Sequence, residues 1–498
     1  MQENLSGTVQ TNIYSIAAFI GYLVLVSGIG IYASRFSSSG VKEYFVGGRK
    51  MNRFVVALSA VVSGRSSWLL LGVTGMAYKM GAAAMWAVLG YTLVEFFLFF
   101  FYARRLRNIS GKYDCITLPD FFTARFGDKS GLLRMVLSVI ILLFMISYVS
   151  AQFVGGGKAF AASFGISPLN GILITAGIVL FYTILGGFLA VSLTDTIQAF
   201  FMIFALLFLP VIAVWDKGGI SVVLAQLRQI DPTMINPLAI SIGAAIGFLG
   251  IGLGSPGNPH IIARYMSIDD PEQLKFSAVV GTIWNILMAF GALCIGLVGR
   301  VYFPDINLLP GADTEQLFPA LAQSHLHPVL FGIVVAAIFA AIMSTADSQL
   351  LVAASSIVRD LYQKVIKKDT TIEQKKLVAY SRITVFALVL ASLVLGLIAK
   401  ELVFWLVLFA WAGLGASLGP TSILALYWKG TSRAGIFSGL VAGTLTTIIW
   451  YNVPLLKSFI YELVPAFIIS LAVTVIVSKL TQKPKHVSEA FQAMKSNK

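Results

Sequence analysis

Long apolar stretches alternate with short polar segments along the whole chain. Each apolar stretch is long enough to cross about 30 Å of hydrocarbon as an α-helix. The pattern predicts 13 membrane-spanning helices, at Tyr14–Ala33, Phe54–Tyr78, Ala82–Ala103, Leu132–Ser163, Asn170–Leu189, Thr194–Trp215, Pro237–Gly257, Phe276–Phe303, Pro328–Val358, Leu377–Ala399, Phe404–Trp428, Gly435–Tyr451 and Ile460–Leu480. We therefore expect an all-α integral membrane domain over residues 1–480, and a disordered cytoplasmic tail over residues 481–498.

Two of these predicted helices are interrupted by glycine, proline and polar residues. The breaks are Ser63-Gly64-Arg65-Ser66-Ser67 in the second span and the segment Gly252–Pro259 in the seventh. Unwound backbone inside a membrane is tolerated where protein buries it or where it lines a polar cavity. Residues 54–215 and 237–428 would then be two five-helix repeats of opposite orientation, with a binding site between the breaks. The alternative is that these glycines only allow close packing of helices.

Composition and charge agree with a membrane transporter and argue against other classes. The chain of 498 residues is 57% hydrophobic and 12% charged, with a mean hydropathy of +0.85. Lys and Arg gather in the loops after the first, third and ninth spans, which predicts a multi-pass cell-membrane protein with its N-terminus outside and its C-terminus inside. The net charge of +14 then reflects topology and anionic lipid, not nucleic acid. We expect no enzyme activity and no cofactor, because no cluster of His, Cys or carboxylates is evident.

The ninth span carries polar side chains that are costly in a membrane. Ser344, Asp347 and Ser348 fall on one helix face, and Thr345 lies beside them. Hydroxyl and carboxylate oxygens suit a hard cation such as sodium. The hydroxyls alone would also fit back-bonding to the preceding turn. Asp195, placed in a short connection before the sixth span, fits either a helix cap or a cation ligand.

Several motifs resemble those of the sodium/solute symporter family, most of all its sodium/proline subgroup. They are the segments 44–49, 118–126, 186–198, 257–260 and 343–351. The resemblance implies a LeuT-like core of inverted repeats with one leading helix and two trailing helices. It also implies alternating access and sodium-coupled symport of proline or a similar small amino or carboxylic acid.

The same resemblance implies particular sodium ligands. One site would use the carbonyls of Val62, Arg65 and Ala341 with the hydroxyls of Ser344 and Thr345. A second, found in some relatives, would use Asp195 with Ser344 and Ser348. From the residues alone we add Asp347 to the ion-binding candidates.

Two departures from the subgroup bear on coupling and substrate. Gly64 replaces an acidic residue, and the neighbouring Arg65 would repel sodium by about 4 kcal/mol at 4 Å unless Asp347 or Asp195 neutralises it. Ile251 and Ser255 stand where the subgroup has aromatic residues that enclose the substrate. Arg65 is therefore expected either to bind a substrate carboxylate or to form a buried ion pair with Asp347.

The substrate site is expected between the two breaks. Its candidate residues are Ser63, Arg65, Ser66, Ser67, Trp68, Tyr148, Gln152, Ile251, Ser255 and Asn258. We expect Lys158 to reach the membrane interface, and His260 and Arg264 to anchor the inner end of the seventh span. Two alternatives stay open: a symporter of another solute in which Arg65 replaces an ion, and a transporter-like membrane sensor.

Overall fold

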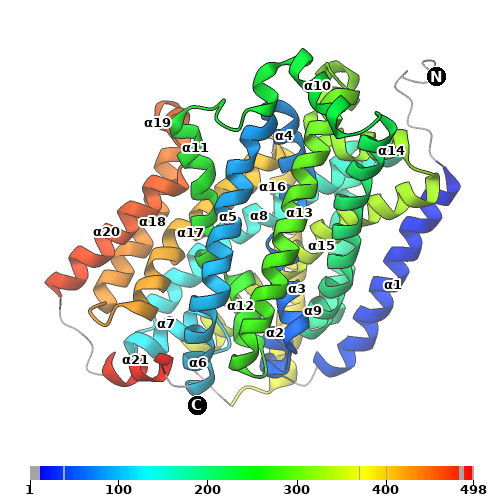
Figure 1. Cartoon of the computed structure of the whole chain (residues 1–498). Coiled ribbons are helices and arrows are strands. Elements are labelled where there is room, and N and C mark those ends of the chain that lie inside the picture. Colours follow the sequence, from blue (N-terminus) through cyan, green and yellow to red (C-terminus); the bar gives the residue numbers. More distant parts are fainter. Residues whose placement is uncertain (1–11, 38–39, 369–370, 400, 482–486, 496–498) are drawn as a thin grey trace.

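The computed structural model describes residues 12–37, 40–368, 371–399, 401–481 and 487–495, and these form one bundle of tilted helices (Figure 1). The described ranges contain no strand, which confirms the all-helical fold. Ten segments among them are long and apolar enough to cross a membrane. Four apolar helices are shorter; one is Ile220–Ile230, and the other three are Arg53–Ser63, Pro168–Ile184 and Ile242–Gly257. These last three belong to helices that are broken or kinked, and the total of 13 spans stays a prediction.

The first broken helix is built from two pieces that meet at Gly64–Ser67. Helix α3 (Arg53–Ser63) begins at Asn52, whose side chain accepts hydrogen bonds from the backbone N–H groups of the first turn. After the break the chain continues as a π-helical stretch (Trp68–Val73) and α4 (Thr74–Met80). Ser66 has φ +48°, a left-handed conformation that costs energy for a serine. The predicted interruption of the second span is thus confirmed.

The next helices complete the first five-helix set. They are α5 (Met85–Phe97), continued through a π-helical turn into α6 (Ala103–Lys112), then the short α7 (Leu118–Phe126), the long α8 (Leu132–Phe164) and α9 (Pro168–Asp216). The prediction of a short connection between Leu189 and Thr194 is wrong, because α9 runs through it and kinks earlier, at Gly187. With φ 59° and ψ −174°, Gly187 adopts a conformation open to glycine alone.

The second broken helix is longer than the sequence indicated. It comprises α11 (Ile242–Leu249), a 3₁₀ stretch (Gly250–Gly257) and α12 (Pro259–Ser267). We predicted that the span ends at Gly257, but Pro259 starts a further helix, since proline fits the first turn, where no intrahelical N–H bond is needed. His260 and Arg264 therefore lie buried inside this helix and are not anchors at its end.

The remaining helices surround this pair. α13 (Leu274–Tyr302), α15 (Pro328–Ser355), α16 (Gln374–Ile398) and α17 (Val403–Tyr427) complete the second set, and α15 packs on α3, α8 and α9. In Figure 1, α1 (Ile13–Ser37) lies at one edge, with α18 (Arg433–Asn452) and α20 (Leu463–Leu480) at the other. α10 (Ile220–Ile230) and α14 (Leu317–His325) cover one end.

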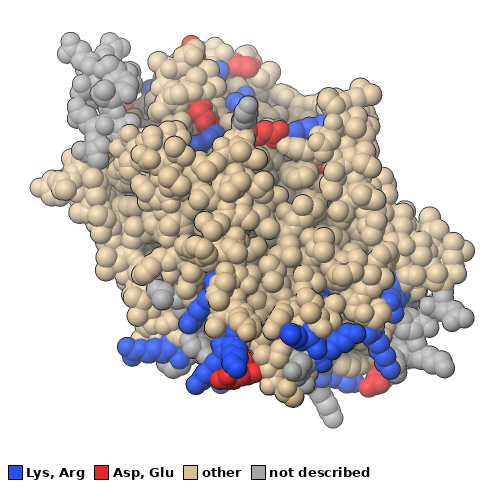
Figure 2. All heavy atoms as spheres, turned by 180° about the vertical axis from the view of Figure 1, so that it is seen from behind, with Lys and Arg blue, Asp and Glu red and all other residues tan. Residues whose placement is uncertain are grey.

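Charged side chains mark the two ends of the bundle. Figure 2 shows Lys and Arg gathered at the end where Figure 1 places α6 and α7, with a band almost free of charge above it. The expectation of a disordered tail is wrong for Val487–Lys495, which forms helix α21 against α6 and α7. Its apolar residues Ala490 and Met494, one turn apart, are buried. This spacing outweighs the polar composition that suggested disorder.

Tight packing of α5 on the second break limits what position 90 tolerates. A Cβ atom at Gly90 would lie 2.1 Å from the carbonyl oxygen of Leu249. We expect Gly90→Ala to lower the stability of the purified protein by about 1–3 kcal/mol, because two backbones must move apart. Thermal unfolding followed by size-exclusion chromatography measures this. Gly28→Ala, where nothing lies within 4 Å, is the control; equal melting temperatures for the two variants would contradict this packing.

Candidate functional site

The first break meets α15 in a group of backbone carbonyls and hydroxyls. Ser344 Oγ lies 3.4 Å from the carbonyl oxygen of Val62 and 3.2 Å from that of Ala341. Thr345 Oγ1 donates to the carbonyl of Ser63 at 3.0 Å. The carbonyl of Arg65 instead accepts a hydrogen bond from Leu69 N. The structure thus brings together four of the five residues expected for the first sodium site.

A buried carboxylate lies next to this carbonyl–hydroxyl group. Asp195 Oδ2 accepts hydrogen bonds from Ser59 Oγ at 2.6 Å and from Ser63 Oγ at 3.0 Å. Ser63 Oγ is in turn 3.3 Å from Ser348 Oγ. Asp195 lies inside α9, about two turns beyond Gly187, and is fully buried. The helix-cap alternative is therefore excluded, and Ser63 lies with the acid rather than in the substrate cavity.

Arg264 supplies a cation to the same place. Its guanidinium bonds to Asp195 Oδ2 at 3.2 Å and to Ser59 Oγ at 3.1 Å, and it also contacts Ser348 Oγ. The second buried acid, Asp347, accepts from Ser348 Oγ at 3.1 Å through Oδ1, while its Oδ2 has no partner among the described residues. Asp195 Oδ1 is likewise unpartnered. We call Ser59, Asp195, Arg264, Asp347 and Ser348 the acid cluster.

The formal charge of the acid cluster favours one additional cation. With both carboxylates ionised, Asp195 and Asp347 contribute two negative charges and Arg264 one positive charge, leaving −1. Two buried carboxylate oxygens without a donor are unfavourable unless a ligand satisfies them. A monovalent cation bound here would neutralise the cluster.

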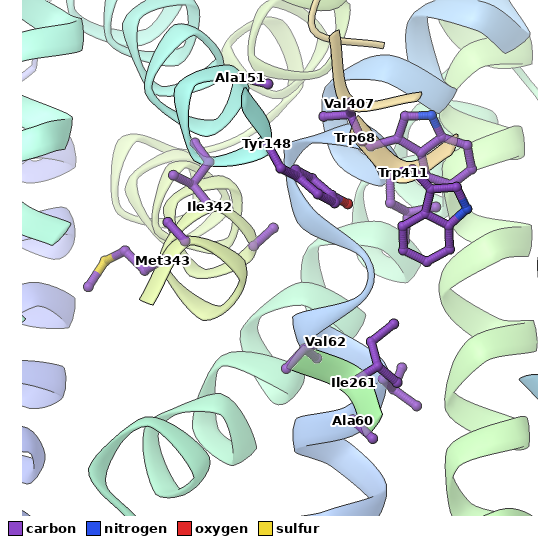
Figure 3. Close-up of a cluster of buried hydrophobic side chains, with 14 of the residues drawn as sticks. Ala60, Val62, Trp68, Tyr148, Ala151, Ile261, Ile342, Met343, Val407 and Trp411 are labelled. Carbon is purple, nitrogen blue, oxygen red and sulfur yellow. The ribbon is translucent and has the colours of Figure 1, made fainter. Parts of the chain in front are cut away.

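A small aromatic cavity lies on the other side of the break. It lies between the first break with the π-helical stretch that follows it, α5, α8, the second break and α17. Its lining residues are Gly64, Arg65, Trp68, Tyr91, Tyr148, Ile251, Val407, Leu408 and Trp411. Figure 3 shows the Tyr148 ring pointing toward Trp68 and Trp411 beside the unwound segment that follows Val62. Trp411 Nε1 donates to the carbonyl of Ile251 at 2.7 Å. At about 10 Å³ the cavity must widen to admit a solute larger than water.

Several polar groups around this cavity lack protein partners. The unpartnered buried atoms near the two breaks include Trp68 Nε1, Tyr91 OH, Gln152 Nε2, Ser255 Oγ, Asn258 Oδ1 and both ring nitrogens of His260. The other groups are engaged: Ser67 N and Oγ both donate to Gln152 Oε1, and Ser66 Oγ accepts from Trp68 N. Unpartnered buried donors and acceptors each cost about 1–3 kcal/mol, and of these residues Trp68 and Tyr91 line the cavity.

Arg65 is neutralised, but not by the residues expected. Its guanidinium forms an ion pair with Glu95 of α5 and donates to Asn285 Oδ1 of α13 through Nε at 2.8 Å and Nη2 at 2.7 Å. It also lies 3.9 Å from the centre of the Tyr91 ring. Asp347 and Asp195 instead belong to the acid cluster. The expected Arg65–Asp347 pair is therefore wrong, and the repulsion of sodium by Arg65 is offset by Glu95.

Sequence reasoning missed Trp411, Tyr91, Glu95, Asn285 and Ser59. A lone acid in the third predicted span was a usable signal for Glu95, because intramembrane charges pair. Tryptophan in an apolar helix carries no comparable signal for Trp411. The ion pairs of Lys158 were missed as well.

Lys158 does not simply reach the interface. Its ammonium group binds Asp313 at 2.7 Å and Glu315 at 2.6 Å. Glu315 also accepts from the backbone N–H groups of Val403 and Phe404, at the start of α17. Phe404 stacks on Trp68, which lines the cavity. Glu315 therefore connects Lys158, through the start of α17, to the cavity wall.

Comparison with known proteins agrees with this architecture. A sodium/proline symporter of Staphylococcus aureus (strain JH9) is 37% identical over 495 residues, which cover 97% of this chain and 96% of that protein. The solved structure of a substrate-bound, outward-open Na⁺-coupled sialic acid symporter superposes with a TM-score of 0.79 at 21% identity, over 95% of this chain and 99% of the other. MhsT in complex with L-phenylalanine matches with a TM-score of 0.54 at 14% identity, over 89% and 99%.

These neighbours are LeuT-fold transporters, which confirms the predicted LeuT-like core. The model of the sodium:solute symporter family matches residues 44–443, which span both broken helices, the acid cluster and the cavity. Together with a relative 37% identical over nearly its whole length, this match shows that the chain belongs to the sodium:solute symporter family.

Proposed function

We propose that this sodium-coupled symporter imports proline or a similarly small amino acid across the cell membrane. The observation that carries the proposal is the adjacency of two sites at the first break. The candidate sodium ligands lie on the α15 side of α3, and an aromatic cavity lies on the other side of the same unwound segment. An ion and a solute that share one flexible segment can favour the same conformation, which is what symport requires.

The aromatic cavity supports proline despite Ile251 and Ser255. Although Ile251 and Ser255 are not aromatic, the cavity is lined by four aromatic side chains, those of Trp68, Tyr91, Tyr148 and Trp411. They offer the apolar area that a pyrrolidine ring buries. The sodium/proline symporters among the relatives support the same solute.

The arrangement of charge supports an inward direction of transport. The acid cluster borders a second small cavity, lined by Arg264, Ser348, Ser355 and Thr117, toward the end rich in Lys and Arg. By the positive-inside rule that end is cytoplasmic, with the N-terminus outside and the C-terminus inside. Sodium held at Asp195 and Ser348 would then be released to the cytoplasm.

Altered coupling, with Arg65 in place of an ion, is less well supported. The charge of Arg65 is balanced by Glu95 on the cavity side of the break. The acid cluster keeps a formal deficit of one positive charge, which a sodium ion would supply.

Sodium-dependent binding of labelled proline to the purified protein tests the ion site. Ser344→Ala and Thr345→Val remove one oxygen each, and we expect the sodium concentration for half-maximal binding to rise about tenfold or more, since bonds to a charged partner contribute about 1.5–3 kcal/mol. Ser324→Ala is the control, because Ser324 only bonds within α14. Unchanged sodium dependence in both site variants would move the ion away from α15, and absence of proline binding by the wild-type protein would exclude proline.

A further inference from the structure

The cavity has one charged side chain among its lining residues, and a carboxylate outside the lining neutralises that charge. Arg65 lines the cavity, and Glu95 does not. The carboxylate of Glu95 binds Arg65 Nη2 and accepts from Asn285 Nδ2 at 2.5 Å through the same oxygen, Oε2. Its other oxygen has no partner among the described residues. The contacts of the Glu95 carboxylate with protein donors are therefore those with Arg65 and Asn285.

The bonds of Arg65 also exclude a two-pronged carboxylate clamp in this arrangement. A carboxylate is held in a bidentate way by two parallel N–H groups of a guanidinium. Here Asn285 Oδ1 receives Nε and Nη2, and Glu95 receives Nη2. Nη1 alone remains, with a contact of 3.3 Å to the carbonyl of Gly64. The expected role of Arg65 as a substrate fork is thus replaced by a different electrostatic role.

We propose that Glu95 is a specificity-determining residue, which cancels the charge of Arg65 so that the cavity selects solutes without net charge. The inference rests on the proposed function, since it takes the aromatic cavity to be the solute site. In a water-excluded cavity an uncompensated charge attracts or repels a solute charge strongly. With Arg65 and Glu95 paired, neither an anion nor a cation is favoured, and a zwitterion keeps its own internal balance.

The proposal separates the two ends of the site by charge. With both carboxylates ionised, the acid cluster carries a formal −1, which a sodium ion would neutralise. The Arg65–Glu95 pair has a net charge of zero, and binding of an amino acid without net charge leaves the total charge at the cavity at zero. Glu95 acts through Arg65, so it is a positioning residue with an electrostatic effect on selectivity.

Three matched solutes test this rule directly. Proline is a zwitterion, cyclopentanecarboxylate is an anion of nearly the same shape, and prolinamide is a cation at neutral pH. Binding of each is measured on purified protein at saturating sodium, for wild type, Glu95→Gln, Arg65→Gln and the double variant Arg65→Gln/Glu95→Gln. The three variants change the charge behind the cavity by +1, −1 and 0.

We expect wild type and the double variant to prefer proline and to reject both ions. Glu95→Gln should bind cyclopentanecarboxylate at least about tenfold more tightly than wild type does, and Arg65→Gln, which leaves the Glu95 charge uncancelled, should show the same gain for prolinamide. Unchanged preferences in both charge-altering variants would overturn the proposal. Loss of proline binding in the double variant would also overturn it, because Arg65 itself would then hold the carboxylate.

Folding and substrate identity are controlled separately. Glu95→Gln leaves a buried guanidinium without its partner, so recovery of monodisperse protein is checked first. If it is not recovered, Arg65→Gln and the charge-free double variant decide the matter by the same criteria. If wild type binds no proline but Glu95→Gln gains the anion, proline falls as the substrate and the charge rule stands. If every variant binds proline as well as wild type does and rejects both ions equally, proline stands as the substrate and the charge rule falls.

Discussion

Replacing Asp195 by asparagine is expected to abolish sodium-stimulated uptake. The carboxylate is fully buried and accepts bonds from Ser59, Ser63 and Arg264, with Oδ1 left free. A carboxylate 4 Å from a monovalent cation contributes about 4 kcal/mol at an effective dielectric constant of 20. We expect sodium affinity to fall more than about a hundredfold, as measured by the sodium dependence of uptake into proteoliposomes.

A second variant distinguishes ion binding from the neutralisation of Arg264. Asp195→Asn also leaves the Arg264 guanidinium short of its counter-charge. In Asp195→Asn/Arg264→Gln no unpaired arginine remains, so recovery of uptake would show that Asp195 serves Arg264 and would contradict sodium binding. Persistent loss is the expected result. Asp231→Asn, at an exposed turn, is the control for folding and expression.

Removing the Trp411 ring is expected to have the largest effect on the solute. Trp411 forms one wall of the cavity, faces Tyr148 edge-on and donates to the carbonyl of Ile251 in the second break. Trp411→Ala deletes packing of about 3 kcal/mol or more, so we expect KM for solute uptake to rise on the order of a hundredfold. Trp411→Phe keeps a ring but loses the hydrogen bond, worth about 1 kcal/mol, and should raise KM about fivefold.

The solvent- or lipid-exposed Trp215 provides the matched control. Its side chain is 81% exposed, so Trp215→Ala should leave KM unchanged. An unchanged KM in Trp411→Ala would place the solute elsewhere than in this cavity. A change in sodium affinity without a change in KM would assign Trp411 to the second break alone.

The sequence predicted the breaks well because their chemistry is local. Gly64 between Ser63 and Arg65, and Pro256 and Pro259 close to glycines, mark unwound backbone in an otherwise apolar helix. The end of the second broken helix was harder to predict from the sequence, because Pro259 follows one helical segment and begins the next. The kink of α9 lies at Gly187, a few residues before the connection that we predicted between Leu189 and Thr194.

Contacts between distant helices were the part that sequence could not supply. Ser348 and Asp195 were identified from their polarity and from resemblance, but their contacts with Arg264 depend on how α9, α12 and α15 meet. Likewise Arg65 pairs with Glu95, 30 positions away, and not with the acids that the sequence suggested. No spacing rule connects such residues, since each lies on a different helix.

The most direct test is uptake of labelled proline into proteoliposomes under an inward sodium gradient, compared with an equal potassium gradient. We expect accumulation against the proline gradient with sodium, no accumulation with potassium, and loss of the sodium effect in Asp195→Asn. Equal uptake under both gradients would contradict sodium-coupled symport. Sodium influx stimulated by another small amino acid but not by proline would keep the coupling and replace the solute.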